Sequence, residues 1–240
     1  MGKHRIIYKG GTELKGKGLT IIKLFAGLFL YAAGIVMTIN ANIGLAPWDV
    51  FHQGLSKTFG ITIGQASIGI GIIIIIINSL FKEKVGWGSL SNMLFIGVFV
   101  DILMLNHIIP EFENLVLRAL MMFSGMFVIG VATYLYISVG LGAGPRDGLM
   151  VALTKRTGKS VRLVRNTIET VVVIIGYFLG GTVGVGTLVI ALTIGVFVQL
   201  AFQLFKFDVK KVEHRFIDED IKLLKKMLTQ PKRDVGAGGK

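Results

Sequence analysis

Two short segments of this sequence share one pattern of glycine, proline and aspartate, and they carry its most distinctive chemistry. Residues 42–49 read Asn-Ile-Gly-Leu-Ala-Pro-Trp-Asp, and residues 140–147 read Gly-Leu-Gly-Ala-Gly-Pro-Arg-Asp. Glycine permits positive φ and close backbone approach, whereas proline suits the first turn of a helix, where its missing N–H is not needed. An aspartate two residues later lies in that turn, against the positive end of the helix dipole. The pattern predicts that a helix breaks and a new one begins at both places.

The new helices, over residues 50–59 and 148–157, are too short to cross a bilayer core of about 30 Å. If they are re-entrant, their N-termini approach the membrane centre and offer free N–H donors to an anion. Arg146 would then bind a carboxylate or phosphate, with Trp48 as its aromatic counterpart. If they lie on the surface, aspartate only caps a loop and Arg146 only helps to set topology. The re-entrant alternative predicts a substrate site formed by Asn42, Pro47, Trp48, Asp49, Pro145, Arg146 and Asp147.

Two carboxylates lie inside apolar stretches, where an unpaired charge costs several kcal/mol. Asp101 has no basic residue one turn away, and its role as a carrier of a coupling proton is the functional hypothesis. The alternative is that it lies near the outer interface and is hydrated. Glu169 belongs to the same coupling hypothesis, but Arg165 precedes it at the spacing of a helical ion pair. That spacing favours a structural role near the cytoplasmic surface for Glu169.

Catalytic and cofactor chemistry have no support in the sequence. There is no cysteine, and the four histidines show no metal-ligand spacing. The segment 157–160, Thr-Gly-Lys-Ser, ends like a phosphate-binding loop, but the required earlier glycine is replaced by Leu153 and no strand precedes it. We therefore expect no enzyme activity, no cofactor and no metal.

The composition identifies the elements that must hold these residues. Of 240 residues, 52% are hydrophobic and only 17% are charged, and the mean hydropathy is +0.71. A soluble chain needs about a quarter charged residues. Apolar stretches long enough to span a membrane predict an all-α polytopic membrane protein with six transmembrane helices, at about residues 23–42, 61–81, 89–105, 115–138, 160–180 and 182–205.

The basic residues are strongly biased to one side of these predicted spans. Of the 26 lysines and arginines, all but Lys57 and Arg118 lie in the N-terminal segment, in alternate connections or after the last span. Basic loops stay in the cytoplasm, so both termini are predicted to be cytoplasmic. This distribution also explains the net charge of +12 better than nucleic-acid binding does.

The sequence repeats itself at an offset of 98 residues without a gap. The Gly-x-x-Pro-x-Asp segments align, and Ile-Gly-Val-Phe-Val recurs at 96–100 and 194–198. Each unit holds three spans, and because three is odd the second unit must enter the membrane from the opposite side. Inverted repeats of this kind are typical of secondary transporters and of some channels, with the site between the halves. The alternative is a duplicated scaffold that moves nothing.

The remaining segments divide the chain. We expect a basic cytoplasmic tail over 1–22, repeat 1 over 23–105, an external loop over 106–114, repeat 2 over 115–206, and a cytoplasmic part over 207–240. Within the last part, alternating apolar and charged residues over 207–228 predict an amphipathic helix, lying along the membrane surface or against a partner.

At its paired Gly-Pro-Asp segments the chain resembles the bacterial YczE/YyaS/YitT family of membrane proteins, and in particular the YczE type. The resemblance covers about residues 20–206 and includes both segments. It does not extend to the soluble C-terminal domain that YitT-type members carry. The resemblance implies a bacterial inner-membrane location, but it implies no substrate and no functional residues.

The main hypothesis is a small secondary transporter for a small solute in the bacterial inner membrane, and the re-entrant alternative makes that solute an anion. The competing hypothesis is a non-transporting scaffold or accessory protein that acts through its cytoplasmic tails. The expected partners are the lipid bilayer, an unidentified small solute and, if the protein is not a monomer, further copies of itself.

Overall fold

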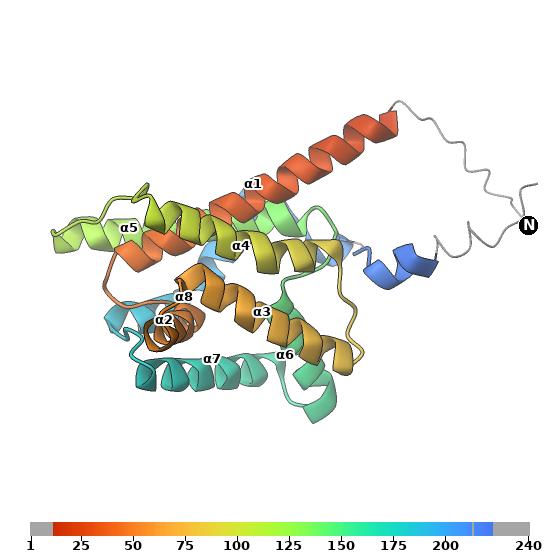
Figure 1. Ribbon diagram of the computed structural model, residues 1–240. Helices are drawn as coiled ribbons and strands as arrows, with labels where there is room; N and C mark the ends of the chain where they lie inside the picture. Colours follow the sequence, from red (N-terminus) through yellow and green to blue (C-terminus); the bar gives the residue numbers. More distant parts are fainter. Residues whose placement is uncertain (1–11, 213, 223–240) are drawn as a thin grey trace, which may run out of the picture.

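The computed structural model describes residues 12–212 and 214–222, and within these residues all regular structure is helical. The predicted all-α fold is therefore confirmed for this part of the chain. The elements, labelled in Figure 1, are α1 (Thr12–Asn40), α2 (Pro47–Phe59), α3 (Ile63–Leu80), α4 (Trp87–Leu105), α5 (Leu115–Ile137), α6 (Pro145–Thr157), α7 (Val161–Phe178), α8 (Val185–Leu204) and the 3-10 helix Val209–Lys211.

The predicted helix breaks lie where the Gly-x-x-Pro-x-Asp pattern put them. In the first segment Gly44 has a φ of 131°, and in the second Gly142 has a φ of 107°, values that L side chains rarely adopt. Proline then occupies the first position of α2 and of α6, as its fixed φ and missing N–H favour. Both short helices end at a left-handed glycine, Gly60 or Gly158.

Three helices of the second half, α6, α7 and α8, begin at the positions that the offset of 98 residues predicts. The bounds of α6 and α7 lie 98 residues after those of α2 and α3, and α8 begins 98 residues after α4. The caps recur as well: the Thr62 hydroxyl accepts a backbone hydrogen bond at the start of α3, and Ser160 does so at the start of α7. The two halves therefore use the same local signals to begin and end their helices.

Helices α1 and α5 form a central pair that runs in opposite directions (Figure 1). Near one end Lys23 lies 4.9 Å from the ring centroid of Tyr134, and near the other Arg118 donates to the Ala41 carbonyl at 2.7 Å. Small residues bring the two backbones together, because a Cβ placed on Gly34 would lie only 2.8 Å from the Gly125 carbonyl oxygen. Close backbone packing of this kind is how helices associate in a bilayer.

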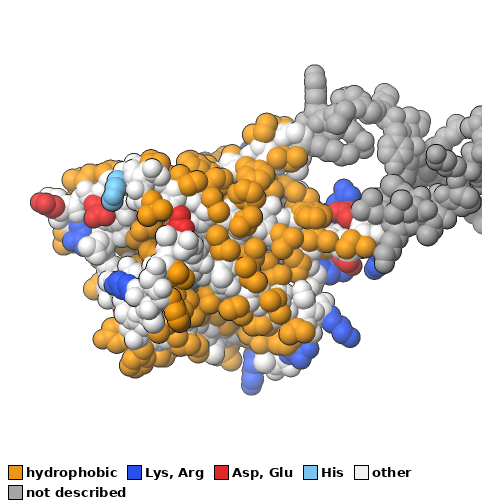
Figure 2. All heavy atoms as spheres, in the orientation of Figure 1, with side chains coloured by type: hydrophobic (Ala, Val, Ile, Leu, Met, Phe, Trp, Pro, Cys, Tyr) orange, Lys and Arg blue, Asp and Glu red, His pale blue; other side chains and the backbone are white. Residues whose placement is uncertain are grey.

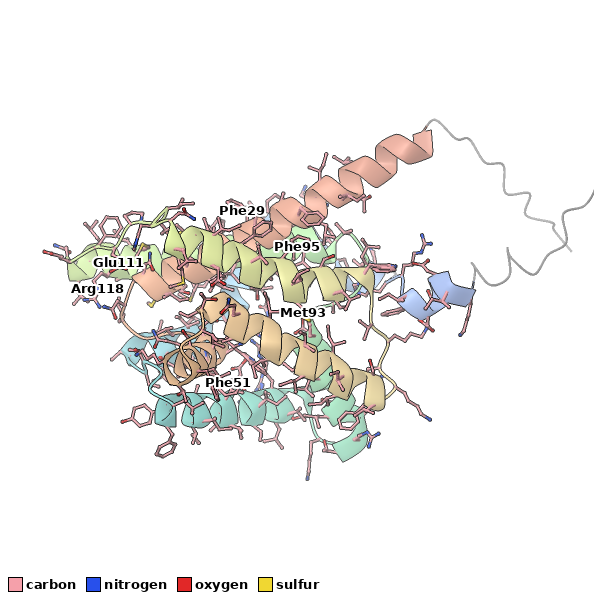
Figure 3. All side chains as sticks on the ribbon, viewed as in Figure 1. Phe29, Phe51, Met93, Phe95, Glu111 and Arg118 are labelled. Carbon is pink, nitrogen blue, oxygen red and sulfur yellow. The ribbon has the colours of Figure 1, made fainter. Side chains whose placement is uncertain are left out.

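Helix α4 packs on the other side of α1 through aromatic side chains (Figure 3). Phe25 and Phe95 meet edge to face with centroids 4.6 Å apart, and Phe29 and Phe99 do so at 5.5 Å. Buried residues of α1, α4 and α5 continue this apolar core. Helix α3 packs against α4, the short helix α2 lies between α3 and α7, and the short helix α6 lies beside α3 and α7 (Figure 1).

Apolar side chains cover the middle of the face shown in Figure 2, while charged side chains gather toward its two ends. Five helices are long and apolar enough to cross a membrane: Gly18–Asn40 of α1, then α3, α4, α5 and α8. The remaining predicted span, over residues 160–180, corresponds to α7, which does not qualify because Arg162, Arg165 and Glu169 lie within its 18 residues. By length and composition the described helices therefore give five spans, one fewer than predicted.

Both tails differ from the predictions where they are described. Helix α1 begins at Thr12, so the predicted tail over 1–22 is helical from residue 12, and residues 1–11 lie outside the described part. The predicted helix over 207–228 is wrong over its first part: a single 3-10 turn is followed by non-helical chain, and a helix begins only at Ile217. Phe207 packs at 5.2 Å against the ring of Tyr134, and tertiary contacts of this kind override the local pattern. Residues 213 and 223–240 are outside the described chain.

Candidate functional site

The first turns of α2 and α6 meet in the interior, and their side chains contact each other. The guanidinium carbon of Arg146 lies 4.7 Å from the ring centroid of Trp48, a cation–π contact. These two residues occupy equivalent positions, 98 apart in sequence. The structure thus brings together the two side chains that the sequence singled out as counterparts.

A histidine one turn into α2 connects Arg146 to Asp49. His52 Nε2 lies 3.3 Å from Arg146 Nη2, and its Nδ1 lies 3.7 Å from Asp49 Oδ1. A guanidinium can only donate, so the hydrogen bond requires a neutral imidazole that accepts at Nε2 and carries its proton on Nδ1. That proton then faces the Asp49 carboxylate. His52 and Asp49 are both buried. The contacts that join Asp49, His52 and Arg146 are therefore shielded from bulk water.

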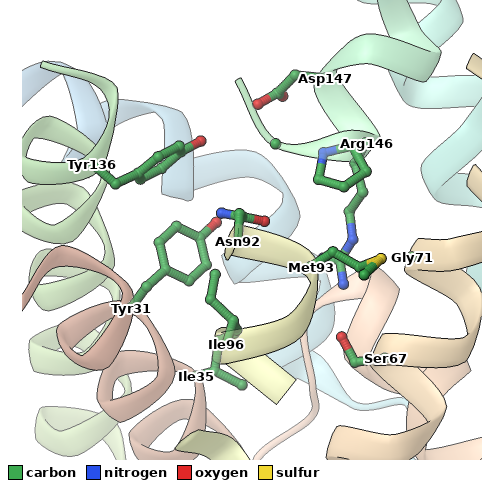
Figure 4. A pocket seen from close by; sticks show the side chains of 12 residues that line it. Tyr31, Ile35, Ser67, Gly71, Asn92, Met93, Ile96, Tyr136, Arg146 and Asp147 are labelled. Carbon is green, nitrogen blue, oxygen red and sulfur yellow. The ribbon is translucent and has the colours of Figure 1, made fainter. Parts of the chain in front are cut away.

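Three adjoining cavities, of about 90, 140 and 110 Å³, surround Arg146 and Tyr31, which line all three. We call them together the central cavities. Figure 4 shows the first, with Tyr31 and Tyr136 on one wall and Ser67 and Arg146 on the other. Five helices contribute to it, namely α1, α3, α4, α5 and α6. The site is therefore built by both halves of the chain.

Asp147 follows Arg146 directly but points to a different side. In Figure 4 its carboxylate lies on the Tyr136 side, away from the Arg146 guanidinium. The ion pairs found among residues 12–212 and 214–222 include neither Arg146 nor Asp147. Arg146 therefore presents a cation to the central cavities with no carboxylate partner in the described chain.

Arg165 and Glu169 form the helical ion pair that their spacing predicted, with Arg165 Nε 2.8 Å from Glu169 Oε1. Both residues line the second and third central cavities. The sequence favoured a place near the cytoplasmic surface for Glu169, whereas the structure places the pair on the wall of the site. Arg165 and Glu169 therefore face cavities inside the bundle.

Asp101 and Asn42 do not join the site. The Asp101 carboxylate accepts hydrogen bonds from Thr62 Oγ1 at 2.5 Å and from the Gly64 N–H at 2.8 Å, and so caps the start of α3. Asp101 has no basic neighbour one turn away on its own helix, and its hydrogen-bond partners come from the start of a different helix. Asn42 is exposed, and its carbonyl oxygen accepts a hydrogen bond from Arg118 at the end of α1.

The remaining predicted residues do converge: Pro47, Trp48, Asp49, Pro145, Arg146, Asp147 and Glu169 all line the central cavities. The sequence reasoning missed the contributions of Tyr31, His52, Tyr136 and Arg165. His52 could have been predicted from its position, because it follows Asp49 by three residues in the same short helix. Tyr31 and Tyr136 could also have been predicted as site residues, since each places a hydroxyl group inside a largely apolar span.

A fourth pocket, of about 400 Å³, leads from the basic end of the molecule toward Pro145 and Asp147. We call it the loop-side pocket. The segment after α8 forms part of its wall with His214 and Phe216. Backbone hydrogen bonds hold this segment in place: the Arg215 N–H donates to Gly140 at 2.8 Å, and the Ile217 N–H donates to Val85 at 3.1 Å.

An ion pair outside the membrane strengthens the same attachment. Lys84 Nζ lies 2.9 Å from Glu219 Oε1, and this hydrogen bond raises the pKa of Lys84 above its usual value. In the described part of the chain, no group of three or more histidine, aspartate or glutamate side chains is placed to hold a metal ion.

The arrangement defines a class: an α-helical membrane protein whose helices break and restart around cavities shared by its two halves. Residues 19–203 match a family described as a family of unknown function, DUF6198. The chain belongs to this family. It is 39% identical over 181 residues to the uncharacterized membrane protein YczE of Bacillus subtilis (strain 168), covering 74% of this chain and 82% of that one.

Two further relatives agree with this membership. An uncharacterized protein of Haemophilus influenzae is 34% identical over 180 residues, 75% of this chain and 82% of its own. The uncharacterized protein YyaS of Bacillus subtilis is 25% identical over 165 residues, 68% of this chain and 82% of its own. The resemblance to the YczE type is thereby confirmed. No solved structure matches the chain.

Proposed function

We propose that this protein is a secondary transporter that carries a small anionic solute across the bacterial inner membrane, with no catalytic step. Its substrate binds at the central cavities, where Arg146 is the principal anion-binding residue. The observation that carries this proposal is the convergence of two helix N-termini on a guanidinium without a carboxylate partner in the described chain. Helix N-termini and arginine both favour anions.

The proposal includes two inverted units of three spans each, with α7 as the sixth span. The antiparallel course of α1 and α5 supports this. So does a pair of equivalent hydrogen bonds: the Gly88 N–H donates to Leu141 at 2.7 Å, and 98 residues later the Gly186 N–H donates to Ile43 at 3.0 Å. Two of the three charged residues of α7, Arg165 and Glu169, are paired and face cavities, and the third, Arg162, lies in the first turn of the helix, so these charges are compatible with a span.

The orientation with both termini in the cytoplasm also belongs to the proposal. In Figure 2 the visible lysine and arginine side chains lie mainly toward the end where α1 begins. Figure 3 shows Arg118 and Glu111 at the opposite end. A cytoplasmic position for the more basic end follows the usual bias of bacterial membrane proteins.

Flux into proteoliposomes tests the proposal. The full chain is reconstituted and offered a panel of small radiolabelled anions, with and without a pH gradient. Arg146→Gln should reduce uptake of the transported anion at least tenfold, while the matched control Arg156→Gln should leave it within twofold. Arg156 is in the same helix, but it is exposed and stacks on Phe81 outside the central cavities. Equal flux in both variants, at equal protein abundance, would refute the proposed role of Arg146.

A further inference from the structure

A groove of about 390 Å³ separates α7 from α8 along the outside of the bundle. We call it the α7–α8 groove. Its α8 side is apolar apart from Thr187, and Leu188 and Leu192 on that side are 63% and 72% exposed. Its α7 side is partly polar, with Asn166, Glu169 and Thr170. The volume lies in the range of small-molecule sites, about 300–1,000 Å³.

The equivalent seam in the first half, between α3 and α4, is closed. A Cβ placed on Gly71 would lie 2.5 Å from Met93 Cγ, and one placed on Gly97 would lie 2.7 Å from the Gly64 carbonyl oxygen. Glycine at these positions lets α3 and α4 touch along their length. At these glycines α3 and α4 are in direct contact, whereas α7 and α8 stand apart at the equivalent positions.

The two seams differ because the sequence differs at equivalent positions. Gly64 and Gly71 of α3 correspond to Arg162 and Glu169 of α7. The side chains of these charged residues are too large for close helix contact, so α7 stands away from α8. Gly195, which corresponds to Gly97, accordingly has no atom near enough to contact an added Cβ. The groove is therefore encoded by specific substitutions in one repeat.

The α7–α8 groove joins the proposed substrate site. Pro47, Glu169 and Ala191 line both the groove and the third central cavity, the one that also contains Trp48 and Arg146. A molecule lying in the groove thus has its inner end beside the cationic part of the site. Its outer end lies among apolar side chains on the surface of a helix that is long and apolar enough to span the membrane.

We infer that the substrate is an amphiphile with an anionic head and a single hydrocarbon chain, which enters from the bilayer with its chain in the α7–α8 groove and its head at Arg146. This inference rests on the proposed function and specifies its substrate class. Lipid tails are as apolar as leucine, so the chain gains little hydrophobic free energy on leaving the bilayer for the groove. Selection therefore depends on the head, where Arg146 and the two helix N-termini supply charge complementarity.

Quenching of Trp48 fluorescence by a chain-brominated fatty acid tests the inference. The full chain carries Trp87→Phe, so that Trp48 is its single tryptophan, and is placed in bilayer nanodiscs. The acid should quench Trp48 saturably, above the non-saturable background given by a brominated phospholipid. The brominated alcohol of the same length should bind at least tenfold more weakly, because it lacks the charge that Arg146 recognises. Equal binding of acid and alcohol, or quenching that does not saturate, would overturn the inference.

A variant pair separates the groove from the anion site. Ala191→Phe fills the junction between groove and cavity and should weaken saturable quenching at least tenfold. Leu200→Phe adds an aromatic ring to the exposed surface of the same helix, away from the groove, and should leave it unchanged. If Ala191→Phe is recovered poorly, the inference is tested by comparing the binding of the brominated fatty acid with that of the brominated alcohol in the Trp87→Phe protein. A short water-soluble anion could instead be transported in an Arg146-dependent way that Ala191→Phe does not affect. That result would support the proposed transport function and refute the amphiphilic substrate.

Discussion

Replacement of Asp101 distinguishes a structural aspartate from one that carries a coupling proton. In the structure its carboxylate accepts hydrogen bonds from Thr62 Oγ1 and the Gly64 N–H at the start of α3. Each hydrogen bond to a charged group contributes about 1.5–3 kcal/mol, and a carboxylate at a helix N-terminus adds about 0.3–1 kcal/mol. Because the site is half-buried and water replaces part of the loss, Asp101→Ala should lower the free energy of unfolding by about 2–4 kcal/mol.

This loss should appear as a fall in Tm of about 5–15 °C for a chain of this size. Asp101→Asn keeps one acceptor oxygen and should lose about half as much. Thermal unfolding of the purified protein in detergent measures Tm, and flux with and without a pH gradient, well below Tm, measures coupling. Glu111→Ala, in the exposed connection before α5, is the matched control and should change neither quantity. If both Asp101 variants keep the wild-type Tm and lose only the flux driven by the pH gradient, the structural interpretation is refuted.

Other substitutions test further contacts. Gly97→Ala should destabilise the protein by about 1–3 kcal/mol through overpacking between α3 and α4, whereas Gly195→Ala at the equivalent position should stay within about 0.5 kcal/mol, both measured by Tm. Asn78→Leu removes the hydrogen bond that its side chain donates at 2.9 Å to the first residue of α6 and should cost about 1–3 kcal/mol; an unchanged Tm would show that this contact does not hold α6. Ile217→Pro removes one backbone donor at a helix start, where proline is tolerated. It should raise maleimide labelling of a cysteine introduced at Ser89, in the loop-side pocket, by about fivefold, corresponding to roughly 1 kcal/mol; an unchanged rate would show that the C-terminal segment does not cover the pocket.

Local signals made much of the fold predictable. Gly-x-x-Pro-x-Asp specifies a break and a restart within a few residues, and α2 and α6 begin at the prolines that the pattern indicated. The offset of 98 residues also predicted the relation between helix bounds. These features depend on neighbouring residues, so they can be read without knowledge of the tertiary structure.

Contacts between distant residues were harder to predict. His52 and Arg146 are 94 positions apart, and only the approach of α2 to α6 brings them together. The hydrogen-bond partners of Asp101 could not be predicted from its own helix, because Thr62 and Gly64 lie at the start of α3. The width of the α7–α8 groove was readable in principle, since Arg162 and Glu169 replace glycines at equivalent positions. Charge within α7 also explains why composition alone supports five spans and not six.

The paired hydrogen bonds between the halves have a consequence for biogenesis. The first N–H groups of α4 and α8 lack partners within their own helices, and in each case a carbonyl from the other half accepts one of them. The Gly88 N–H cannot form its hydrogen bond to the Leu141 carbonyl until Leu141 has been translated, more than fifty residues later. Until then this N–H group has to be satisfied by water or by another acceptor. Two separate polypeptides cut within residues 106–114 should assemble when produced together, while either fragment produced alone should be degraded.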